Sequence, residues 1–490
     1  MRIVHVASEV TPWSQTGGLG EVVAALPEAL ARQDGTLEVS VVTPLYRTTR
    51  ARAAQLGAIL EDTGIEVAVA FPAADLAARI VRLKAPRGAV QHFFLDCPPL
   101  YDRDAQYGGV NGDYPDNALR FAFLARAALA AAQRTGSPPD LFHVHDWHPG
   151  LLPVYLQRAG RPAASVMTIH NLAFQGVFDK QTVVDLGLDW SVFTPQSMEL
   201  YDRVSFLKGG LAAADAVTTV SPSYAIEIVT PRFGSGLHGF LKYDVKQLVG
   251  IRNGIDTTAW DPATDGAIPV HFSAGDLAGK AACRKALAAE RELTPAKGDL
   301  LVGMVSRVTE QKGVDLVADL VPELHGLGVR LVVLGSGETP LEQRLSWLAE
   351  RFRQHLSVTI GFDPLLARRI FAGADCVLVP SRFEPCGLTQ MYAMRYGAVP
   401  IVNPVGGLRD TVTDPGDDAL AEGKGTGFWM EETSAAGLRA ALRRAAGMCR
   451  YQQKGWRRLV EQCMTRDFSW EQPAAEVLAL YRQVLAARTT

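Results

Sequence analysis

Short apolar segments alternate with longer helical segments along nearly the whole of this 490-residue chain. This alternation is typical of parallel β-sheets whose faces are covered by helices, so we predict an α/β protein. No repeat of roughly 20–50 residues is visible, which disfavours solenoids and propellers. The predicted strands lie at residues 3–7, 39–43, 141–145, 164–169 and 216–220 in the first half, and at 300–305, 330–334, 358–360, 376–380 and 399–402 in the second.

The length suggests two or three domains, and the pattern favours two doubly wound, Rossmann-like domains that face a cleft. We place them at residues 1–250 and 251–467, followed by a C-terminal helix over 468–490. Polar, helix-breaking residues at 257–266 would suit a hinge or crossover, and the segment near 253–260 is the hinge candidate. Ligands in such sheets bind beyond the carboxyl ends of the strands, so the residues that follow each strand are the candidates for function.

Charge and cysteine content exclude several classes of protein. The chain has 49 Lys and Arg against 52 Asp and Glu, a net charge of −3, which removes the main electrostatic reason to expect nucleic acid or an anionic membrane as partner. No apolar run approaches the roughly 18 residues that span a bilayer. The six cysteines form no CxxC pair, and a strand is predicted from the first residues without a leader. We therefore expect a cytoplasmic protein with reduced thiols.

The first predicted strand is followed by a glycine-rich loop, TGGLG, that contains Gly17 and Gly18. A helix is expected to begin near residues 19–21, so its unpaired N–H groups would point at the loop and could bind a phosphate. The loop is neither GxGxxG nor a Walker sequence, and an ordinary tight turn is the alternative.

Two cations lie on the loop after the strand at 300–305. Arg307 and Lys312 are five residues apart, directly before a helix. Arginine offers a planar fork of donors and lysine a compact charge, so together they could clamp a diphosphate. The alternative is a pair of solvated loop cations.

The segment SRFEPCGLTQ, after the strand at 376–380, carries the strongest local signal. Glu384 lies between Arg382 and a helix expected to open at Gly387, an environment that favours an ionised carboxylate. Such a group could accept hydrogen bonds from sugar hydroxyls and stabilise positive charge at an anomeric carbon. The alternative is a surface ion pair between Arg382 and Glu384. Cys386 lacks an evident base, which favours a buried structural thiol.

The segment HVHDWHPG ends another strand and contains His143, His145 and Asp146. Zinc is one possible ligand, but we expect His143 and His145 to alternate across the strand, which disfavours a metal site. His145 facing a polar cleft is preferred. Asp116 begins a helix at residue 117 and could be its N-cap. A DxD triplet at residues 102–104 is interpreted as a surface loop.

Together these motifs resemble bacterial glycogen synthases and plant starch synthases. TGGLG, HVHDWHPG, TIHNLAFQG, VSRVTEQKG, SRFEPCGLTQ and GGLRDTV occur in the family's order across almost the whole chain. The resemblance implies a GT-B fold, with a C-terminal helix that crosses back. It also implies retaining transfer of glucose from ADP-glucose to the 4-hydroxyl end of an α-1,4-glucan such as glycogen, without metal or another cofactor.

The resemblance also implies roles for individual residues. Arg307 and Lys312 would neutralise the leaving diphosphate, and Glu384 would hold the donor glucose and support an oxocarbenium-like transition state. His145 is matched to a histidine near the donor sugar. The other implied contacts are Gln15, Gly17, Gly18, Cys386, Gly387, Leu388, Gly406 and Gly407 with the donor, and Asp116 and Asn253 with glucose or acceptor.

Three sites depart from the pattern of the family or its wider relatives. Gln15 stands where the family has lysine, and residues 403–405 (Asn-Pro-Val) replace a basic residue and a threonine near the donor. Tyr392 stands where the wider GT-B transferases often carry a second glutamate, and it fits the narrower glycogen and starch synthase pattern. The first two leave open a related transferase that uses UDP-glucose or a short acceptor. A non-catalytic glucan-binding paralogue and an oxidoreductase are further alternatives, the latter opposed by the missing GxGxxG.

Overall fold

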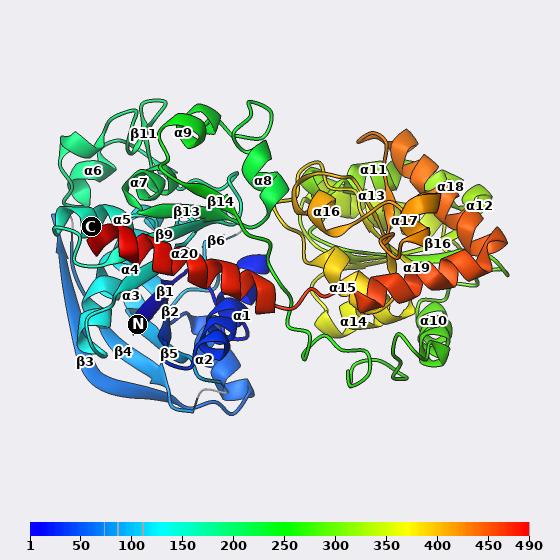
Figure 1. The fold of residues 1–490 in the computed structure, drawn as a ribbon, viewed down its shortest axis with the longest axis horizontal. Helices are drawn as coiled ribbons and strands as arrows, with labels where there is room; N and C mark the ends of the chain where they lie inside the picture. Colours follow the sequence, from blue (N-terminus) through cyan, green and yellow to red (C-terminus); the bar gives the residue numbers. More distant parts are fainter. Residues whose placement is uncertain (73, 86–87, 110–111, 490) are drawn as a thin grey trace. The chain divides into compact units, whose positions relative to one another are not determined.

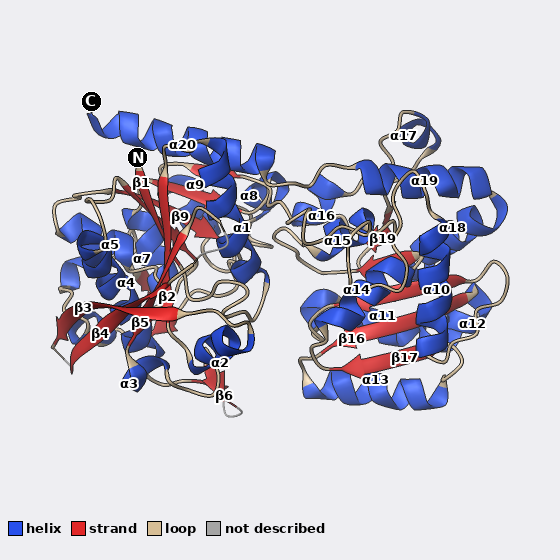
Figure 2. Ribbon diagram, turned by 90° about the horizontal axis from the view of Figure 1, so that it is seen from below, coloured by secondary structure: helices blue, strands red, loops and turns tan. Residues whose placement is uncertain are grey.

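The computed structural model describes residues 1–489 except 73, 86–87 and 110–111. The chain forms two compact α/β units, one made of Met1–Gly254 with Trp470–Thr490 and the other of Ile255–Ser469. In each unit, helices cover a central sheet (Figure 2). Among the helices of the described residues, none has both the length and the apolar character needed to cross a bilayer. All six cysteines are free thiols.

The first unit is built on a nine-stranded sheet with the order β14-β13-β9-β8-β1-β2-β5-β4-β3. The seven strands from β14 to β5 are parallel to their neighbours. Numbered 1 to 7 in the order of the sequence and read from β5 to β14, these strands have the order 3-2-1-4-5-6-7. The strand order therefore reverses between β1 and β8. Their bounds are β1 Arg2–Val6, β2 Glu38–Pro44, β5 Gln91–Asp96, β8 Leu141–His145, β9 Ala164–Ile169, β13 Ala216–Thr219 and β14 Leu248–Gly250.

A long antiparallel hairpin extends this sheet at one edge. It consists of β3 (Leu60–Phe71) and β4 (Ala74–Leu83), and β4 pairs antiparallel with β5. The sequence did not predict these strands. Their side chains alternate between buried and exposed over much of the hairpin, which differs from the continuous apolar runs of the buried parallel strands.

Helices pack on the first sheet, and the last helix of the chain is among them. Figure 1 shows α20 (Glu471–Thr489), in red, in the unit that contains α1 (Gly18–Gln33). Helix α20 contacts α1 and β9, and Trp470 and Tyr481 belong to the buried core there. The other helices of this unit are α2 Arg47–Gln55, α3 Pro98–Tyr101, α4 Asn117–Arg134, α5 Leu152–Arg158, α6 Thr182–Asp185, α7 Phe206–Ala213, α8 Pro222–Glu227 and α9 His238–Tyr243.

The second unit contains a six-stranded sheet, parallel throughout, with the order β17-β16-β15-β18-β19-β20. Numbered within the unit, this is the Rossmann order 3-2-1-4-5-6, and it reverses between β15 and β18. The strands are β15 Leu300–Val305, β16 Val329–Gly335, β17 Leu356–Ile360, β18 Cys376–Val379, β19 Val399–Val402 and β20 Phe428–Trp429.

The helices of the second unit lie on both faces of its sheet, as the alternating pattern predicts (Figure 2). Their bounds are α10 Ala278–Glu290, α11 Val314–Leu320, α12 Leu324–Leu327, α13 Thr339–Arg351, α14 Pro364–Gly373, α15 Thr389–Arg395, α16 Gly406–Thr411, α17 Asp417–Ala421, α18 Ala435–Tyr451 and α19 Gln453–Thr465. The doubly wound architecture of both halves is therefore confirmed.

The predicted strands agree closely with the observed ones. Strands β8, β9, β15 and β19 have the predicted bounds, and the other six differ by at most two residues at either end. The reversal points of the two sheets lie at β1/β8 and at β15/β18. Because ligands of open α/β sheets bind at such points, the loops after these four strands are where a site is expected.

Candidate active site

In the second unit, the loops that follow β15 and β18 are in direct contact. A 3-10 helix, Glu310–Lys312, ends at Gly313, whose φ of 70° is left-handed. A Cβ at Gly313 would lie 2.4 Å from the carbonyl oxygen of Pro380. Only glycine fits there, since a side chain would be strained by the backbone angle and blocked by the neighbouring loop. The glycine therefore lets the loop that carries Lys312 approach the end of β18.

Backbone and side-chain bonds join the same two loops. The Arg382 N–H donates to the Gln311 carbonyl at 2.9 Å, and the Gln311 side chain donates to the Phe383 carbonyl at 3.3 Å. The Arg382 guanidinium makes two 2.7 Å bonds to the carboxylate of Asp315 in α11. The expected position of Arg382 beside the Glu384 carboxylate is therefore wrong, because Asp315 offers it a bidentate partner.

Glu384 is paired with Lys312 instead. Its Oε2 accepts from Lys312 Nζ at 2.6 Å and from Ser381 Oγ at 2.9 Å, and the residue is only 5% exposed. The Ser381 carbonyl in turn accepts from Asn403 Nδ2 at 2.8 Å. These bonds hold a carboxylate in a defined orientation at the carboxyl end of β18. The structure thus brings together two of the predicted residues, Lys312 and Glu384.

Arg307 lies on the same loop as Lys312 and is exposed. Its Nη2 donates to Gln311 Oε1 at 3.0 Å, and among the described residues it has no carboxylate partner. A guanidinium without a counter-charge, next to the reversal point of a Rossmann sheet, is suited to an anionic ligand.

The segment after Glu384 is ordered by backbone geometry. Gly387 has a left-handed φ of 72°, so α15 begins at Thr389 and not at Gly387 as predicted. The side chain of Gln390 donates to the carbonyls of Cys386 and Gly387 at 3.1 and 2.7 Å. Leu388 is the N-cap residue of this helix. Cys386 is buried, in agreement with a structural thiol.

The glycines of the GGLRDTV segment contact this loop. The N–H of Gly407 donates to the Glu384 carbonyl at 3.0 Å, and a Cβ at Gly407 would lie 2.2 Å from the Cys386 carbonyl oxygen. The amide of Gly407 is therefore already used within the protein, and the residue supports the Glu384 loop by close packing. Gly406 begins α16 and is buried. Contact of either glycine with a donor stays a prediction.

In the first unit, the TGGLG loop leads directly into α1. The helix begins at Gly18, slightly earlier than predicted, and Gly17 occupies its N-cap position without a side-chain cap. Gln15, Gly17 and Gly18 are all exposed. Gln15 Nε2 donates to Glu21 Oε1 at 3.0 Å. The uncapped start of a 16-residue helix is a suitable place for an anion.

A buried carboxylate that the sequence did not single out supports this loop from beneath. Glu9 follows β1, and its carboxylate accepts from the Thr16 N–H and, at 3.1 Å, from the Thr16 hydroxyl. Burial raises the pKa of Glu9 to about 7, although the bonds from Thr16 oppose that shift. The available signal in the sequence was an acidic residue three positions after the end of the first strand.

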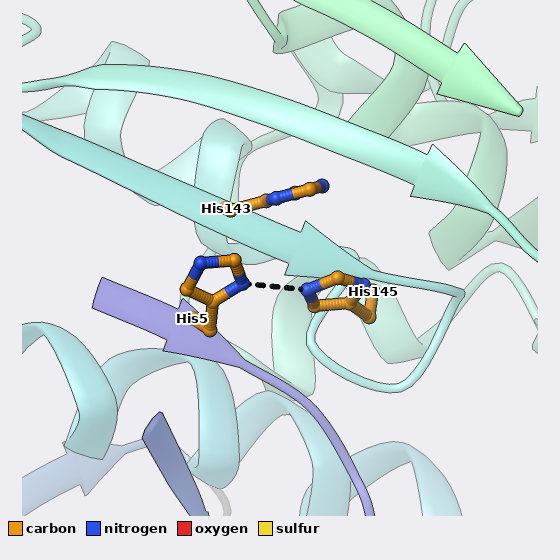
Figure 3. Close-up of side chains that lie close together, drawn as sticks. All are labelled: His5, His143 and His145. Atoms are coloured by element: carbon orange, nitrogen blue, oxygen red, sulfur yellow. Dashed lines mark hydrogen bonds between the residues drawn. The ribbon is translucent and has the colours of Figure 1, made fainter. Parts of the chain in front are cut away.

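Four histidines gather at the centre of the same sheet. His5 lies on β1, His143 and His145 lie on β8, and His170 follows β9. The rings of His143 and His145 stack with centroids 4.2 Å apart, so the expectation that they alternate across the strand is wrong. Residues two apart share a face of a strand. Figure 3 shows His143 beside the hydrogen-bonded pair of His5 and His145.

Three of these rings form a group that could hold a metal ion, since the candidate ligand atoms of His5, His143 and His145 lie within 4.8 Å of one another. Most of their ring nitrogens, however, already make hydrogen bonds within the protein. His143 bonds to the Thr168 hydroxyl at 2.6 Å and to the Tyr481 hydroxyl, and His5 Nδ1 lies 3.0 Å from His145 Nε2. The group includes no carboxylate to balance a divalent charge. A hydrogen-bonded cluster therefore fits these residues better than a metal centre.

His145 and His170 differ in accessibility. His145 is fully buried, and its two ring nitrogens face His5 and His170 at 3.0 Å each. His170 is partly exposed. The accessible imidazole at this point is therefore His170, the histidine of the TIHNLAFQG motif, which was not among the predicted site residues. The catalytic role assigned to His145 stays a prediction.

Asp146 supports His170 from the loop after β8. It has a left-handed φ of 59°, which is unusual for a residue other than glycine, and its Oδ1 accepts from the His170 N–H at 2.7 Å. Burial raises the pKa of Asp146 to about 7.

The acidic residues near α4 serve internal contacts. Asp116 is the N-cap residue of α4, but its side chain makes no cap bond, and it pairs with Arg103 instead. Asp102 and Asp104, the DxD acids, both bind Arg47. The predicted N-cap position of Asp116 is therefore confirmed, although its side chain does not cap the helix, and the interpretation of the triplet as a surface loop is supported. Asn253 is buried near the end of this unit's first segment.

Comparisons with known proteins identify the family. Residues 2–243 match the family model "Starch synthase catalytic domain", and residues 288–447 match "Glycosyl transferases group 1". A glycogen synthase of Anaeromyxobacter dehalogenans is 48% identical over 98% of this chain and 99% of its own. The chain belongs to the glycogen and starch synthase family. A second glycogen synthase, from Syntrophotalea carbinolica, is 41% identical over 99% of both chains.

Solved structures agree with this membership. The catalytic domain of Arabidopsis thaliana starch synthase IV, bound to ADP and acarbose, matches with a TM-score of 0.90 and 33% identity over 99% of each chain. A sucrose-phosphate synthase of Thermosynechococcus elongatus matches with a TM-score of 0.58 at 18% identity, which supports the fold alone. The predicted GT-B fold is therefore confirmed.

Asn403, which departs from the family pattern, and Tyr392, which differs from the wider GT-B transferases, have structural roles in this glycogen and starch synthase family member. Asn403 is buried and holds the Ser381 carbonyl beside Glu384. Tyr392 stacks on Trp260 with ring centroids 3.9 Å apart. Both side chains therefore stabilise the second unit, Asn403 by a hydrogen bond and Tyr392 by ring stacking.

Proposed function

We propose that this protein is a glycogen synthase that transfers glucose from ADP-glucose to the non-reducing 4-hydroxyl end of an α-1,4-glucan, with retention of configuration. The observation that carries the proposal is the largely buried ion pair between Lys312 and Glu384 at the reversal point of the second sheet. Arg307, which has no carboxylate partner among the described residues, lies on the same loop as Lys312. Full-length relatives named glycogen synthase support the reaction, and the ADP and acarbose in starch synthase IV support a nucleotide donor and a glucan-like ligand.

The reaction breaks the bond between the anomeric carbon and the diphosphate oxygen and forms a bond to the acceptor 4-oxygen. Arg307 and Lys312 take up the negative charge that the leaving diphosphate acquires. Glu384 stabilises positive charge on the sugar ring. The proton of the acceptor hydroxyl passes to the leaving phosphate oxygen, so no second carboxylate is required. Two fixed cations can do the charge-neutralising work of a metal ion, and the proposal therefore includes no metal or other cofactor.

The expected partners are the glucan and the sugar nucleotide, in the cytoplasm. Nucleic acid and membranes are not expected, given the net charge of −3. The competing function is a related transferase that uses UDP-glucose or a short acceptor. It is favoured by Gln15 and Val405, which replace residues expected near the donor. A non-catalytic paralogue is disfavoured because the Lys312–Glu384 ion pair is intact.

Radiolabelled transfer to glycogen tests the proposal. Purified protein is incubated with ADP-[14C]glucose or UDP-[14C]glucose side by side, each with and without EDTA. We expect faster transfer from ADP-glucose, insensitive to EDTA, into product that an α-1,4-specific amylase releases. Transfer confined to UDP-glucose would establish the competing function, and no transfer from either donor would favour the non-catalytic one.

A further inference from the structure

Three imidazoles in the first unit form a continuous hydrogen-bonded chain. His5 Nδ1 lies 3.0 Å from His145 Nε2, and His145 Nδ1 lies 3.0 Å from His170 Nε2. The chain crosses the reversal point of the sheet, from β1 through the end of β8 to the residue after β9. His5 and His145 are fully buried, whereas His170 is partly exposed. The chain thus connects the interior of the sheet to its accessible edge.

The chain must have a direction. Burial lowers the pKa of His5 and of His170 to about 3, and that of His145 well below its usual value, so all three rings are neutral at pH 7. A neutral imidazole has one N–H donor and one bare acceptor nitrogen. His145, bonded on both sides, therefore donates to one neighbour and accepts from the other. Two directions are possible, and they leave opposite tautomers on His170.

His5, at the buried end of the three imidazoles, decides between the two directions of these hydrogen bonds. His5 Nε2 is buried and has no hydrogen-bond partner among the described residues. A proton on that nitrogen would be a buried donor without an acceptor, and unpaired buried N–H groups are rarer than under-satisfied acceptors. The proton of His5 therefore belongs on Nδ1, from which it donates to His145 Nε2. His145 then donates from Nδ1 to His170 Nε2, which leaves the proton of His170 on Nδ1.

We propose that His5 and His145 are positioning residues that fix His170 as its Nδ1–H tautomer, so that His170 presents a hydrogen-bond donor to an oxygen of the bound substrates. Among the described residues, none bonds to His170 Nδ1, so this donor is available to a ligand. The identity of the ligand rests on the proposed function, whereas the tautomer does not. In this arrangement His170 donates to a substrate oxygen and does not accept a proton there.

The tautomer can be measured on the unmodified protein. In [15N]histidine-labelled full-length protein, two-bond correlations between ring nitrogens and carbon-bound protons distinguish protonated from bare nitrogens, and the His170 signals are assigned by their loss in His170→Asn. We expect His170 to be protonated on Nδ1 and bare on Nε2 at pH 7. A proton on Nε2, or a mixture of both tautomers, would overturn the proposal. This measurement needs no substrate, so it is independent of whether the enzyme proves to be a glycogen synthase.

Variants of the inner end test the link to catalysis. His5→Phe keeps an aromatic ring but removes the donor, and we expect kcat/KM to fall by about two- to tenfold, the range for one neutral hydrogen bond. His5→Asn, whose amide can still donate, should restore most of the loss. His143→Phe is the matched control. His143 is buried in the same cluster and stacks on His145, but it is not part of the hydrogen-bonded series of His5, His145 and His170. Equal losses in His5→Phe and His143→Phe would mean that the effect is only structural.

A double-mutant cycle separates tautomer control from packing. In His170→Asn the amide has no tautomers, so adding His5→Phe should cause little further loss of kcat/KM. If His5→Phe costs the same factor in both backgrounds, His5 does not act through His170 and the proposal fails. The 15N spectrum of His5→Phe gives the second readout, in which we expect His170 to become a mixture of tautomers.

Discussion

Replacing Glu384 with glutamine separates its role in turnover from donor binding. The substitution keeps the side-chain shape and an oxygen that can accept from Lys312 Nζ and Ser381 Oγ, but it removes the negative charge. The Coulomb energy between a carboxylate and a unit positive charge on an anomeric carbon about 4 Å away is about 4 kcal/mol at an effective dielectric constant of 20. Lys312, only 2.6 Å away, offsets part of this field. We therefore expect a loss of about 3 kcal/mol, or roughly a hundredfold in kcat.

Donor affinity should respond differently. In the unmodified protein the ammonium of Lys312 is shared with Glu384, and both side chains are largely buried. Without the carboxylate, Lys312 is a partly buried cation without a counter-charge, which destabilises the protein in the absence of nucleotide. A diphosphate would supply the missing charge. We expect ADP to bind equally well or up to about tenfold more tightly, and to raise the melting temperature of Glu384→Gln by more than that of the unmodified protein.

The assays are steady-state glucose transfer, calorimetric titration with ADP and thermal unfolding with and without ADP. Ser381→Ala is the matched control, because it removes the second bond to the same carboxylate oxygen and leaves the charge in place; its kcat should fall by no more than about tenfold. A parallel loss of ADP affinity and kcat in Glu384→Gln would show that Glu384 acts mainly in ground-state binding. A kcat within tenfold of the unmodified protein would also refute the reasoning.

Three other substitutions test separate parts of the account. Arg307→Ala removes a cation without a carboxylate partner, and we expect ADP binding measured by calorimetry to weaken by about tenfold or more without loss of stability; unchanged affinity would remove Arg307 from the donor site. Gln15→Lys restores a charge on the TGGLG loop but places it beside Glu21, so the KM for ADP-glucose should fall by less than tenfold, and a larger gain would show that Glu21 does not screen it. Glu9 has a pKa raised to about 7 by burial, which disfavours its charged form in the folded state; Glu9→Gln should therefore increase the free energy of unfolding at pH 8 by at most about 3 kcal/mol, and the gain should fade as the pH falls from about 7 toward the unfolded value near 4.5. Urea unfolding at pH 8 and pH 5 measures this difference, and an equal effect at both pH values would contradict it.

The parallel core of both sheets could be predicted from the sequence because buried parallel strands are continuous apolar runs. The strands at Leu300–Val305 and Val399–Val402 are examples, and polar residues follow each of them directly. The edge hairpin Leu60–Phe71 and Ala74–Leu83 could not be predicted in this way. Its register is set by antiparallel pairing between two half-exposed strands, which leaves no continuous apolar run.

The sequence predicted which positions along the chain belong to the site, but not which of their side chains bond to each other. Position after a strand was enough to select Arg307, Lys312 and Glu384, and the structure shows that Lys312 and Glu384 bond to each other. The choice of Asp315 as partner of Arg382 depends on how α11 packs after the 3-10 turn. The sequence contained His5, but its contact with His145 follows from the pairing of β1 with β8, which only the sheet order reveals.

The central claim is that fixed cations of the second unit take up the charge of a departing nucleoside diphosphate. A crystal structure of the protein with ADP tests it most directly. We predict that Arg307 and Lys312 both lie within hydrogen-bond distance, about 3.2 Å or less, of phosphate oxygens. A bound ADP whose phosphates are remote from both side chains, with Arg307 and Lys312 facing solvent, would contradict the account.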